Sequence, residues 1–312
     1  MVTRFIDLHE DFGITSGKED VFNGTTQSSL DALSKFDETV IYSVVFPLTR
    51  RWAVQSHEKG YKFDPSEYFP DHNSLFRQVR FYQSLEREGL VKLVRNKSDL
   101  RAPGTKFLMA MEGTDTISGE EDVRFLKENG LRSIGLTWNT ETRFAASCAS
   151  RKDYGLTGSG EDLVKLCNEL HIGIDLGHAS DQTIIDTANM SKYPVVVSHT
   201  NPKSYFKVFR NMSDEAIEAV VKNKGIIGLT SIISTLGDSP DINNLVESIK
   251  YVGESYGWEF PALGSDFLGI SSTLKGFDSV SDIHVLGEKL GEHAEDVLWN
   301  NSLRAISAIL EQ

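Results

Sequence analysis

The sequence predicts a single (β/α)8 barrel, in which parallel strands alternate with helices and close into a cylinder. Short apolar, β-branched runs alternate with longer amphipathic segments about eight times along the 312 residues, a length natural for one such barrel. The apolar runs lack strict alternation, as expected of parallel strands buried on both faces. A doubly wound sheet is the main competing fold, but the first apolar run is not followed by a glycine-rich phosphate turn.

The predicted elements follow this alternation along the chain. We expect strands over Arg4–Asp11, Thr39–Phe46, Phe107–Gly113, Ser133–Asn139, Gly173–Ala179, Val195–Thr200, Gly225–Ile232 and Ala262–Phe267. We expect helices over Thr26–Lys35, Ser74–Glu88, Gly119–Asn129, Gly158–Leu170, Asp181–Met190, Asp214–Asn223 and Asp241–Tyr256. Ser213, followed by Asp214 and Glu215, is a typical helix start, with a capping hydroxyl and acidic residues in the first turn.

Two segments fall outside the repeating pattern, and no linker or internal repeat divides residues 1–312. The stretch 47–73 is rich in aromatic residues, glycine and proline, and we interpret it as a lid packed over the barrel. Residues 278–312 are predicted to form two C-terminal helices, the second starting near Glu292, that pack on the barrel exterior.

Composition excludes several classes of protein. Hydrophobic residues make up 39 % of the chain and charged residues 25 %, which indicates a folded core. The net charge of −13 argues against a nucleic-acid partner, since phosphates would be repelled. The two cysteines, Cys148 and Cys167, have no metal-finger spacing. No apolar run is long enough to span a bilayer or form a signal peptide, so we expect a cytoplasmic protein without a membrane partner. A homodimer is left open.

Metal-binding and proton-transferring residue types follow several predicted strands. In a barrel the C-terminal strand ends meet at one mouth, so these residues are expected to gather there. Each alone would be read as a loop cap or a core-edge residue, but burying them together is costly unless cations pair with them. Two divalent ions bridged by one carboxylate would supply that compensation. The residues are His9, Asp11, Glu112, His178, His199 and Asp266.

Together these segments resemble the membrane (renal) dipeptidase family of zinc metallopeptidases, within the amidohydrolase-like barrels, and in particular its soluble, prokaryotic-type branch. The matching segments occur in family order and span nearly the whole chain. They are Asp7–Asp11, Met111–Gly113, Leu131–Asn139, Tyr154–Thr157, Ile174–Ser180, Val197–Asn201, Arg210–Asp214 and Leu263–Phe267.

The resemblance implies a binuclear centre, with two divalent ions that are expected to be Zn²⁺. By the family pattern His9 and Asp11 bind one ion, His178 and His199 bind the other, and Glu112 bridges both.

The resemblance also assigns residues to the substrate. Arg210 would hold the substrate, Asp266 would move protons beside the bridging water, and Trp138 and Asn139 are candidate substrate contacts. Trp138 stands where the membrane-anchored branch has histidine in a Leu-Thr-His-Asn context. Indole is a donor only, so it cannot ligate metal or transfer a proton. The family's Asp-Phe-Asp-Gly also becomes Asp266-Phe267-Leu268-Gly269, which removes one acid.

The expected activity is that of a metal-dependent dipeptidase that cleaves dipeptides, including ones with D-residues, through a metal-bridging hydroxide. A related barrel amidohydrolase acting on acyl-amino acids, lactones or phosphoesters is the alternative that Trp138 keeps open. An inactive metal-binding scaffold is the non-enzymatic alternative. The complete set of ligand residue types argues against it.

Overall fold

The computed structural model describes residues 2–15, 20–23, 27–50 and 68–312. Within these ranges, eight parallel strands close into a barrel in the order β2-β1-β11-β10-β9-β8-β7-β6, and β6 pairs back to β2. Each overlaps one predicted strand, so the barrel prediction is confirmed. The strands are β1 (Arg4–Glu10), β2 (Glu38–Val45), β6 (Gly104–Met111), β7 (Leu131–Gly135), β8 (Gly173–Asp175), β9 (Val196–Thr200), β10 (Ile226–Leu229) and β11 (Pro261–Leu263).

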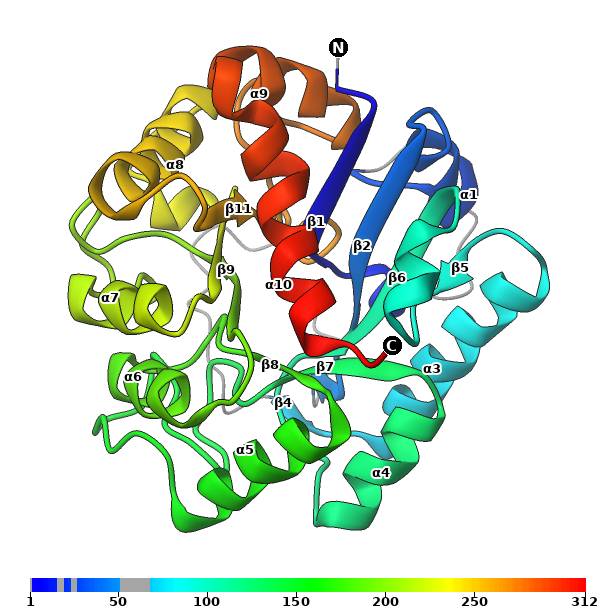
Figure 1. The fold of residues 1–312 in the computed structure, drawn as a ribbon, viewed down its shortest axis with the longest axis vertical. Helices are drawn as coiled ribbons and strands as arrows, with labels where there is room; N and C mark the ends of the chain where they lie inside the picture. The colour runs from blue at the N-terminus through cyan, green and yellow to red at the C-terminus, as the bar shows by residue number, and fades with distance from the viewer. Residues whose placement is uncertain (1, 16–19, 24–26, 51–67) are drawn as a thin grey trace.

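Helices surround the barrel (Figure 1). The larger ones are α3 (His72–Arg87), α4 (Glu120–Glu128), α5 (Gly158–Leu170), α6 (Asp181–Met190), α7 (Asp214–Lys222) and α8 (Ile242–Tyr256). The predicted cap of α7 is present, since the Ser213 hydroxyl accepts a hydrogen bond from the Ala216 N–H.

The helix predicted over 26–35 is shorter than expected. In the described part of this range, α2 (Leu30–Leu33) is the only helix, and the short helix α1 (Asp20–Asn23) lies before it. The helix ends before Lys35 because β2 begins only three residues later, at Glu38. The Asp37 N–H donates to the carbonyl of Thr3, which precedes β1.

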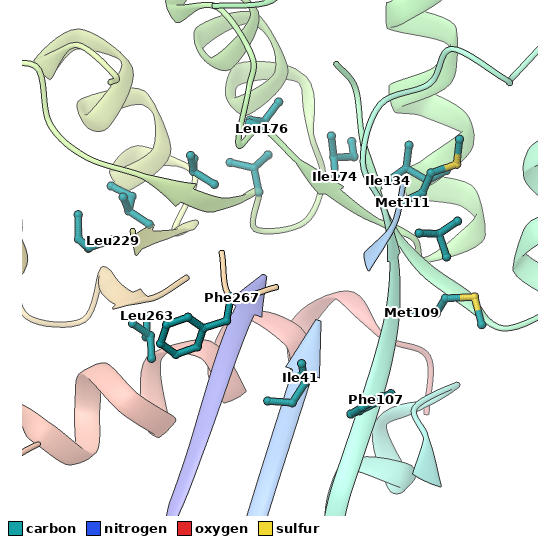
Figure 2. Close-up of a cluster of buried hydrophobic side chains, with 14 of the residues drawn as sticks. Ile41, Phe107, Met109, Met111, Ile134, Ile174, Leu176, Leu229, Leu263 and Phe267 are labelled. Atoms are coloured by element: carbon teal, nitrogen blue, oxygen red, sulfur yellow. The ribbon is translucent and has the colours of Figure 1, made fainter. Parts of the chain in front are cut away.

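The main hydrophobic cluster lies between the strands and the surrounding helices. Figure 2 shows part of it, with side chains from β2, β6, β7, β8, β10 and β11. Phe107 and Met109 of β6, which are two residues apart and therefore on one face, belong to this cluster with Leu126 of α4 and Leu163 of α5. Burial of this layer holds the helices against the barrel.

A second cluster fills the barrel interior, and the C-terminal helix belongs to it. Ile6 and Leu8 of β1 are buried with Trp299 and Ile306. After α9 (Ile283–Leu290), a π-helical turn (Asp296–Asn300) and α10 (Asn301–Ile309) cross the N-terminal end of the barrel (Figure 1). The Asn301 side chain donates to the carbonyl of Pro261, where β11 begins. The helix that was expected on the barrel exterior therefore covers the N-terminal end of the barrel rather than its flank.

Three short strands lie outside the barrel order. β5 (Lys92–Leu93) pairs with β6, and β3 (Leu48–Arg50) pairs antiparallel with β4 (Tyr68–Pro70). The β3–β4 pair is the described part of the predicted lid, whose middle, 51–67, lies outside the described residues. Cys148 and Cys167 are both free thiols. Among the described helices, none is both long and apolar enough to cross a bilayer.

Candidate metal centre

An irregularity in β1 aims His9 at the barrel mouth. Three steps along β1, from Asp7 to Glu10, lie opposite two steps along β2, from Ile41 to Ser43. The extra residue is a β-bulge, which changes the side-chain alternation. Leu8 can therefore face the interior while His9, the next residue, also reaches the mouth.

A second bulge has the same effect in β9. The three steps from Val197 to Thr200 lie opposite the two steps from Ile227 to Leu229 of β10. Both Ser198 and His199 are brought toward the mouth, and the His199 ring centroid lies 3.7 Å from that of His9.

Two buried carboxylates fix the backbone just before these ligand candidates. Asp7 Oδ1 accepts from the N–H groups of His9 and Ser265, at 3.1 and 2.9 Å. Asp175 Oδ1 accepts from the N–H groups of Gly177 and Ser198, at 3.0 and 2.9 Å. Each carboxylate thus ties the end of its own strand to a neighbouring segment.

Glu112, which follows β6, is the meeting point of three imidazoles. Its Oε1 lies 3.0 Å from His178 Nε2, 3.4 Å from His199 Nε2 and 3.8 Å from His9 Nε2. The Nε2 atoms of His178 and His199 are themselves 3.0 Å apart.

The remaining acids lie on the His9 side. His9 Nε2 is 3.5 Å from Asp11 Oδ2 and 3.7 Å from Asp266 Oδ1. Two groups of potential ligands therefore share Glu112, namely His9–Asp11–Glu112 and Glu112–His178–His199, each with its atoms within 4.8 Å of one another.

The hydrogen bonds of the imidazoles fit a site for cations. Asn139 Oδ1 lies 2.9 Å from His178 Nδ1, and Ser198 Oγ lies 2.8 Å from His199 Nδ1. With the Nδ1 protons donated to these oxygens, both Nε2 lone pairs point at one another and at the Glu112 carboxylate. His9 Nε2 is also buried, without a hydrogen-bond partner among the described residues. Imidazole nitrogens and carboxylate oxygens whose lone pairs converge in this way are typical ligands of a divalent metal ion.

The pKa values of the cluster are those of crowded, buried groups. Burial raises the pKa of Glu112 to about 8 and that of Asp266 to about 7. Burial lowers the pKa of His178 and of His199 well below the usual value, and positive neighbours lower both further. Burial alone would lower the pKa of His9, but the surrounding carboxylates, Glu112 foremost, outweigh it and raise the pKa to about 10.

Backbone geometry places Asp266 against Asp11. Asp266 has φ of 64°, in the left-handed region that few non-glycine residues adopt, and its N–H donates to the His9 carbonyl. A Cβ on Gly269 would lie 2.2 Å from Asp11 Oδ2 and 2.6 Å from Asp266 Oδ1. Glycine is needed there because it leaves room for the two acids.

A cavity of about 680 Å³ opens onto the cluster. Aromatic residues form one wall, where the Trp138 ring lies 5.1 Å from Phe46 and 4.8 Å from Tyr68, centroid to centroid. Val208, Phe209 and Ile232 contribute further apolar lining.

Arg210 also lines the cavity and carries unused donors. Its Nη2 donates to the His199 carbonyl at 2.7 Å. Its Nε and Nη1 are buried and have no hydrogen-bond partner among the described residues.

The structure brings together all the residues that the sequence singled out for the site. Asp11, Glu112, Trp138, Asn139, His178, Arg210 and Asp266 line the cavity, and His9 and His199 lie in the cluster behind it. Asn139, predicted as a substrate contact, also has its side-chain oxygen on His178.

Sequence reasoning missed the residues around this set. Ser198 is adjacent to a predicted ligand, but a serine in an apolar strand gives no signal of its own. Asp7 and Asp175 could have been found as acids within apolar runs, two and three residues before a histidine.

The fold and the cluster define a class, that of (β/α)8 barrels with candidate metal ligands at the C-terminal mouth. Residues 3–312 match the sequence profile described as membrane dipeptidase, peptidase family M19. The chain belongs to this family.

Two sequence relatives are a fungal dipeptidase and a bacterial protein. The chain is 30 % identical to the dipeptidase verJ of Clonostachys rogersoniana over 214 residues, 65 % of this chain and 55 % of that protein. A Klebsiella pneumoniae protein, uncharacterized and encoded in the pqqA 5′ region, is 28 % identical over 76 % of this chain and 97 % of its own length. The chain thus spans about half the length of the fungal dipeptidases that it matches.

Similarity to solved structures supports the fold. A metallopeptidase from Rhodobacter sphaeroides, solved with a phosphinate mimic of the dipeptide L-Ala-D-Ala, superposes with a TM-score of 0.85 at 19 % identity, covering 99 % of this chain and 100 % of its own. A family M19 dipeptidase superposes with a TM-score of 0.84 at 19 % identity, over the full length of both chains.

Proposed function

We propose that this protein is a metallodipeptidase that hydrolyses the peptide bond of dipeptides. It would use two divalent ions, expected to be Zn²⁺, bound at the barrel mouth. The observation that carries the proposal is the pair of ligand groups that share Glu112. His9 and Asp11 would hold one ion, His178 and His199 the other, and Glu112 would bridge them.

Bound in this way, the two ions would supply a bridging hydroxide as nucleophile and polarise the scissile carbonyl. Asp266 would accept the proton of the attacking water and return it to the leaving amine. Its place 3.7 Å from His9 Nε2, beside Asp11, puts its carboxylate at the edge of the proposed centre.

Arg210 would select substrates with a free carboxylate. Arg210 lines the cavity, and two nitrogens of its buried guanidinium have no hydrogen-bond partner among the described residues, so this planar group is suited to binding a carboxylate through paired hydrogen bonds. The C-terminal carboxylate of a dipeptide supplies this group, and a cavity of about 680 Å³ is within the size range of small-molecule sites.

D-residues at the C-terminal position are part of the proposal. The ligand of the Rhodobacter structure mimics L-Ala-D-Ala, and that protein shares this fold. An N-acyl-amino acid is the second candidate substrate, because the aromatic wall of Phe46, Tyr68 and Trp138 suits an apolar acyl group.

A substrate panel on metal-loaded protein separates these candidates. Dipeptides with L- and D-residues at the C-terminal position should be hydrolysed, and faster than N-acyl-amino acids, lactones or phosphoesters. Absence of dipeptide hydrolysis in protein shown to hold two ions would contradict the proposal.

Arg210→Met tests the carboxylate contact. It should lower kcat/KM for free dipeptides by a factor equivalent to about 2–5 kcal/mol, and far less for the dipeptide amides. Arg101→Met, at an exposed arginine, is the matched control and should leave both rates unchanged. Equal losses on free dipeptides and amides would identify Arg210 as structural.

A further inference from the structure

Ser198 lies between two imidazoles that come from different strands. It is fully buried in the β9 bulge. Its Oγ is 2.8 Å from Nδ1 of His199 and 3.5 Å from Nδ1 of His9. The two ring planes are tilted by 40° and their centroids are 3.7 Å apart, so a single hydroxyl reaches both rings.

The surroundings hold this hydroxyl in place. The Ser198 N–H is bound to Asp175 Oδ1 at 2.9 Å, which fixes the backbone of the bulge. Gly177 faces the serine from the segment after β8, and a Cβ there would lie 2.8 Å from both Ser198 Oγ and the His199 ring. Space for the hydroxyl therefore depends on a glycine.

A neutral imidazole has one N–H, and the partner of that N–H decides which nitrogen is free to bind a cation. The Nε2 atoms of His9 and His199 lie 3.8 and 3.4 Å from Glu112 Oε1, on the side of the proposed ions, so the protons of these two rings belong on Nδ1. Nδ1–H needs an acceptor when buried. A serine oxygen has two lone pairs and can accept from both rings at once.

We propose that Ser198 is a positioning residue for both halves of the metal centre, because its one hydroxyl holds His9 and His199 in the tautomer that presents Nε2 to the ions. The inference rests on the proposed two-ion site. His9 groups with Asp11 and Glu112, His199 groups with His178 and Glu112, and the two histidines also form a group with Asp266. Of the three imidazoles, Asn139 has a hydrogen bond with that of His178 alone, at Nδ1, so it would affect one half of the centre.

Metal titration of three variants tests this difference. Metal-stripped protein is titrated with Zn²⁺ against a competing chelator. Ser198→Ala should weaken the binding of both ions by about 10–100-fold each, the usual effect of losing a hydrogen bond behind a ligand. Asn139→Ala should weaken one ion only. Ser43→Ala is the matched control, since Ser43 is equally buried in β2 and its hydroxyl donates to the Ile41 carbonyl.

A direct measurement of the tautomer supports the titration. Nitrogen-15 NMR of the imidazoles in the zinc-loaded wild type should find the proton of His9 and of His199 on Nδ1. A proton on Nε2 of either ring overturns the inference, and this result does not depend on whether Ser198→Ala folds.

The outcomes distinguish the inference from the proposed function. If the wild type binds two ions and Ser198→Ala binds both as tightly as Ser43→Ala, the role of Ser198 is wrong and the two-ion centre stands. If Ser198→Ala loses one ion only, Ser198 serves one half and the coupling is wrong. If the wild type itself takes up fewer than two ions, the two-ion proposal fails and this inference with it.

Discussion

Glu112 is the residue through which the two halves of the proposed centre are connected, since its Oε1 lies within 3.8 Å of all three histidine Nε2 atoms. Glu112→Gln replaces a carboxylate by a neutral amide, which cannot bridge two cations and offset their repulsion. We expect the affinity for both ions to fall by more than the ~10–100-fold typical of losing a hydrogen bond behind a ligand. Elemental analysis and chelator competition measure this.

Glu10→Gln is the control for that experiment. Glu10 is fully buried on the same strand as His9, and burial raises its pKa well above the usual value, which favours the neutral form that an amide resembles. This variant should keep both ions. Wild-type affinity in Glu112→Gln would mean that Glu112 is not the bridge.

Metal binding should release protons. In the metal-free protein the pKa of Glu112 is raised to about 8 and that of His9 to about 10, so at pH 7 these groups are protonated and must lose protons to bind cations. Affinity should therefore rise with pH, until about pH 8 through loss of the Glu112 proton and until about pH 10 through loss of the His9 proton. His178 and His199, whose pKa values are lowered, contribute no protons.

Calorimetric titration in two buffers of different ionisation enthalpy counts the released protons. A pH-independent affinity with no proton release would show that the cluster is already deprotonated before metal binds. That result would contradict the raised pKa values of Glu112 and His9.

Trp138 gives the aromatic wall its shape, in contact with Phe46 and Tyr68. Trp138→His should change the relative rates for substrates with large and small apolar groups by about tenfold or more, while metal content stays the same. Trp258→His, at a tryptophan stacked on His293, is the control and should not alter relative rates. Lower thermal stability with unchanged relative rates would make Trp138 a packing residue only.

At the scale of elements, the strands could be predicted because apolar, β-branched runs mark them, and α6 begins and ends at the predicted residues Asp181 and Met190. The bulges in β1 and β9 could not, since a bulge depends on the register of the neighbouring strand rather than on local sequence. Ser198 therefore appeared as an ordinary strand residue.

The position of α10 could not be predicted from the sequence either. Its apolar face predicts burial, but an amphipathic helix fits the barrel flank and the barrel end equally well. The hydrogen bond from the Asn301 side chain to the Pro261 carbonyl, at the start of β11, holds the helix at the end of the barrel.

Ile306→Ala tests this arrangement of α10. Ile306 is 1 % exposed and packs with residues of the barrel interior, so the substitution should lower the free energy of unfolding by about 2–5 kcal/mol. Val285→Ala, at a side chain 39 % exposed on α9, should change it by no more than about 0.5 kcal/mol. Denaturant titration gives both values, and equal small effects would contradict burial of α10 against the barrel.

At the scale of the whole molecule, the barrel gathers into one mouth residues that are spread from His9 to Asp266 along the chain. Because the C-terminal ends of barrel strands meet at one mouth, the sequence predicts that these residues gather there. The spacing of the residues along the chain does not say which of them bind which ion. That division came from the family resemblance, and the shared position of Glu112 supports it. The aromatic wall depends on Phe46, Tyr68 and Trp138 meeting from distant segments, so no local pattern predicts it.

The measurement that tests the central claim most directly is the rate of dipeptide hydrolysis as zinc is added back to metal-stripped protein. We predict that the stripped protein is inactive and that the rate rises to a plateau at two equivalents per chain. Full activity in the stripped protein, or a plateau at one equivalent, would contradict a two-ion centre bridged by Glu112.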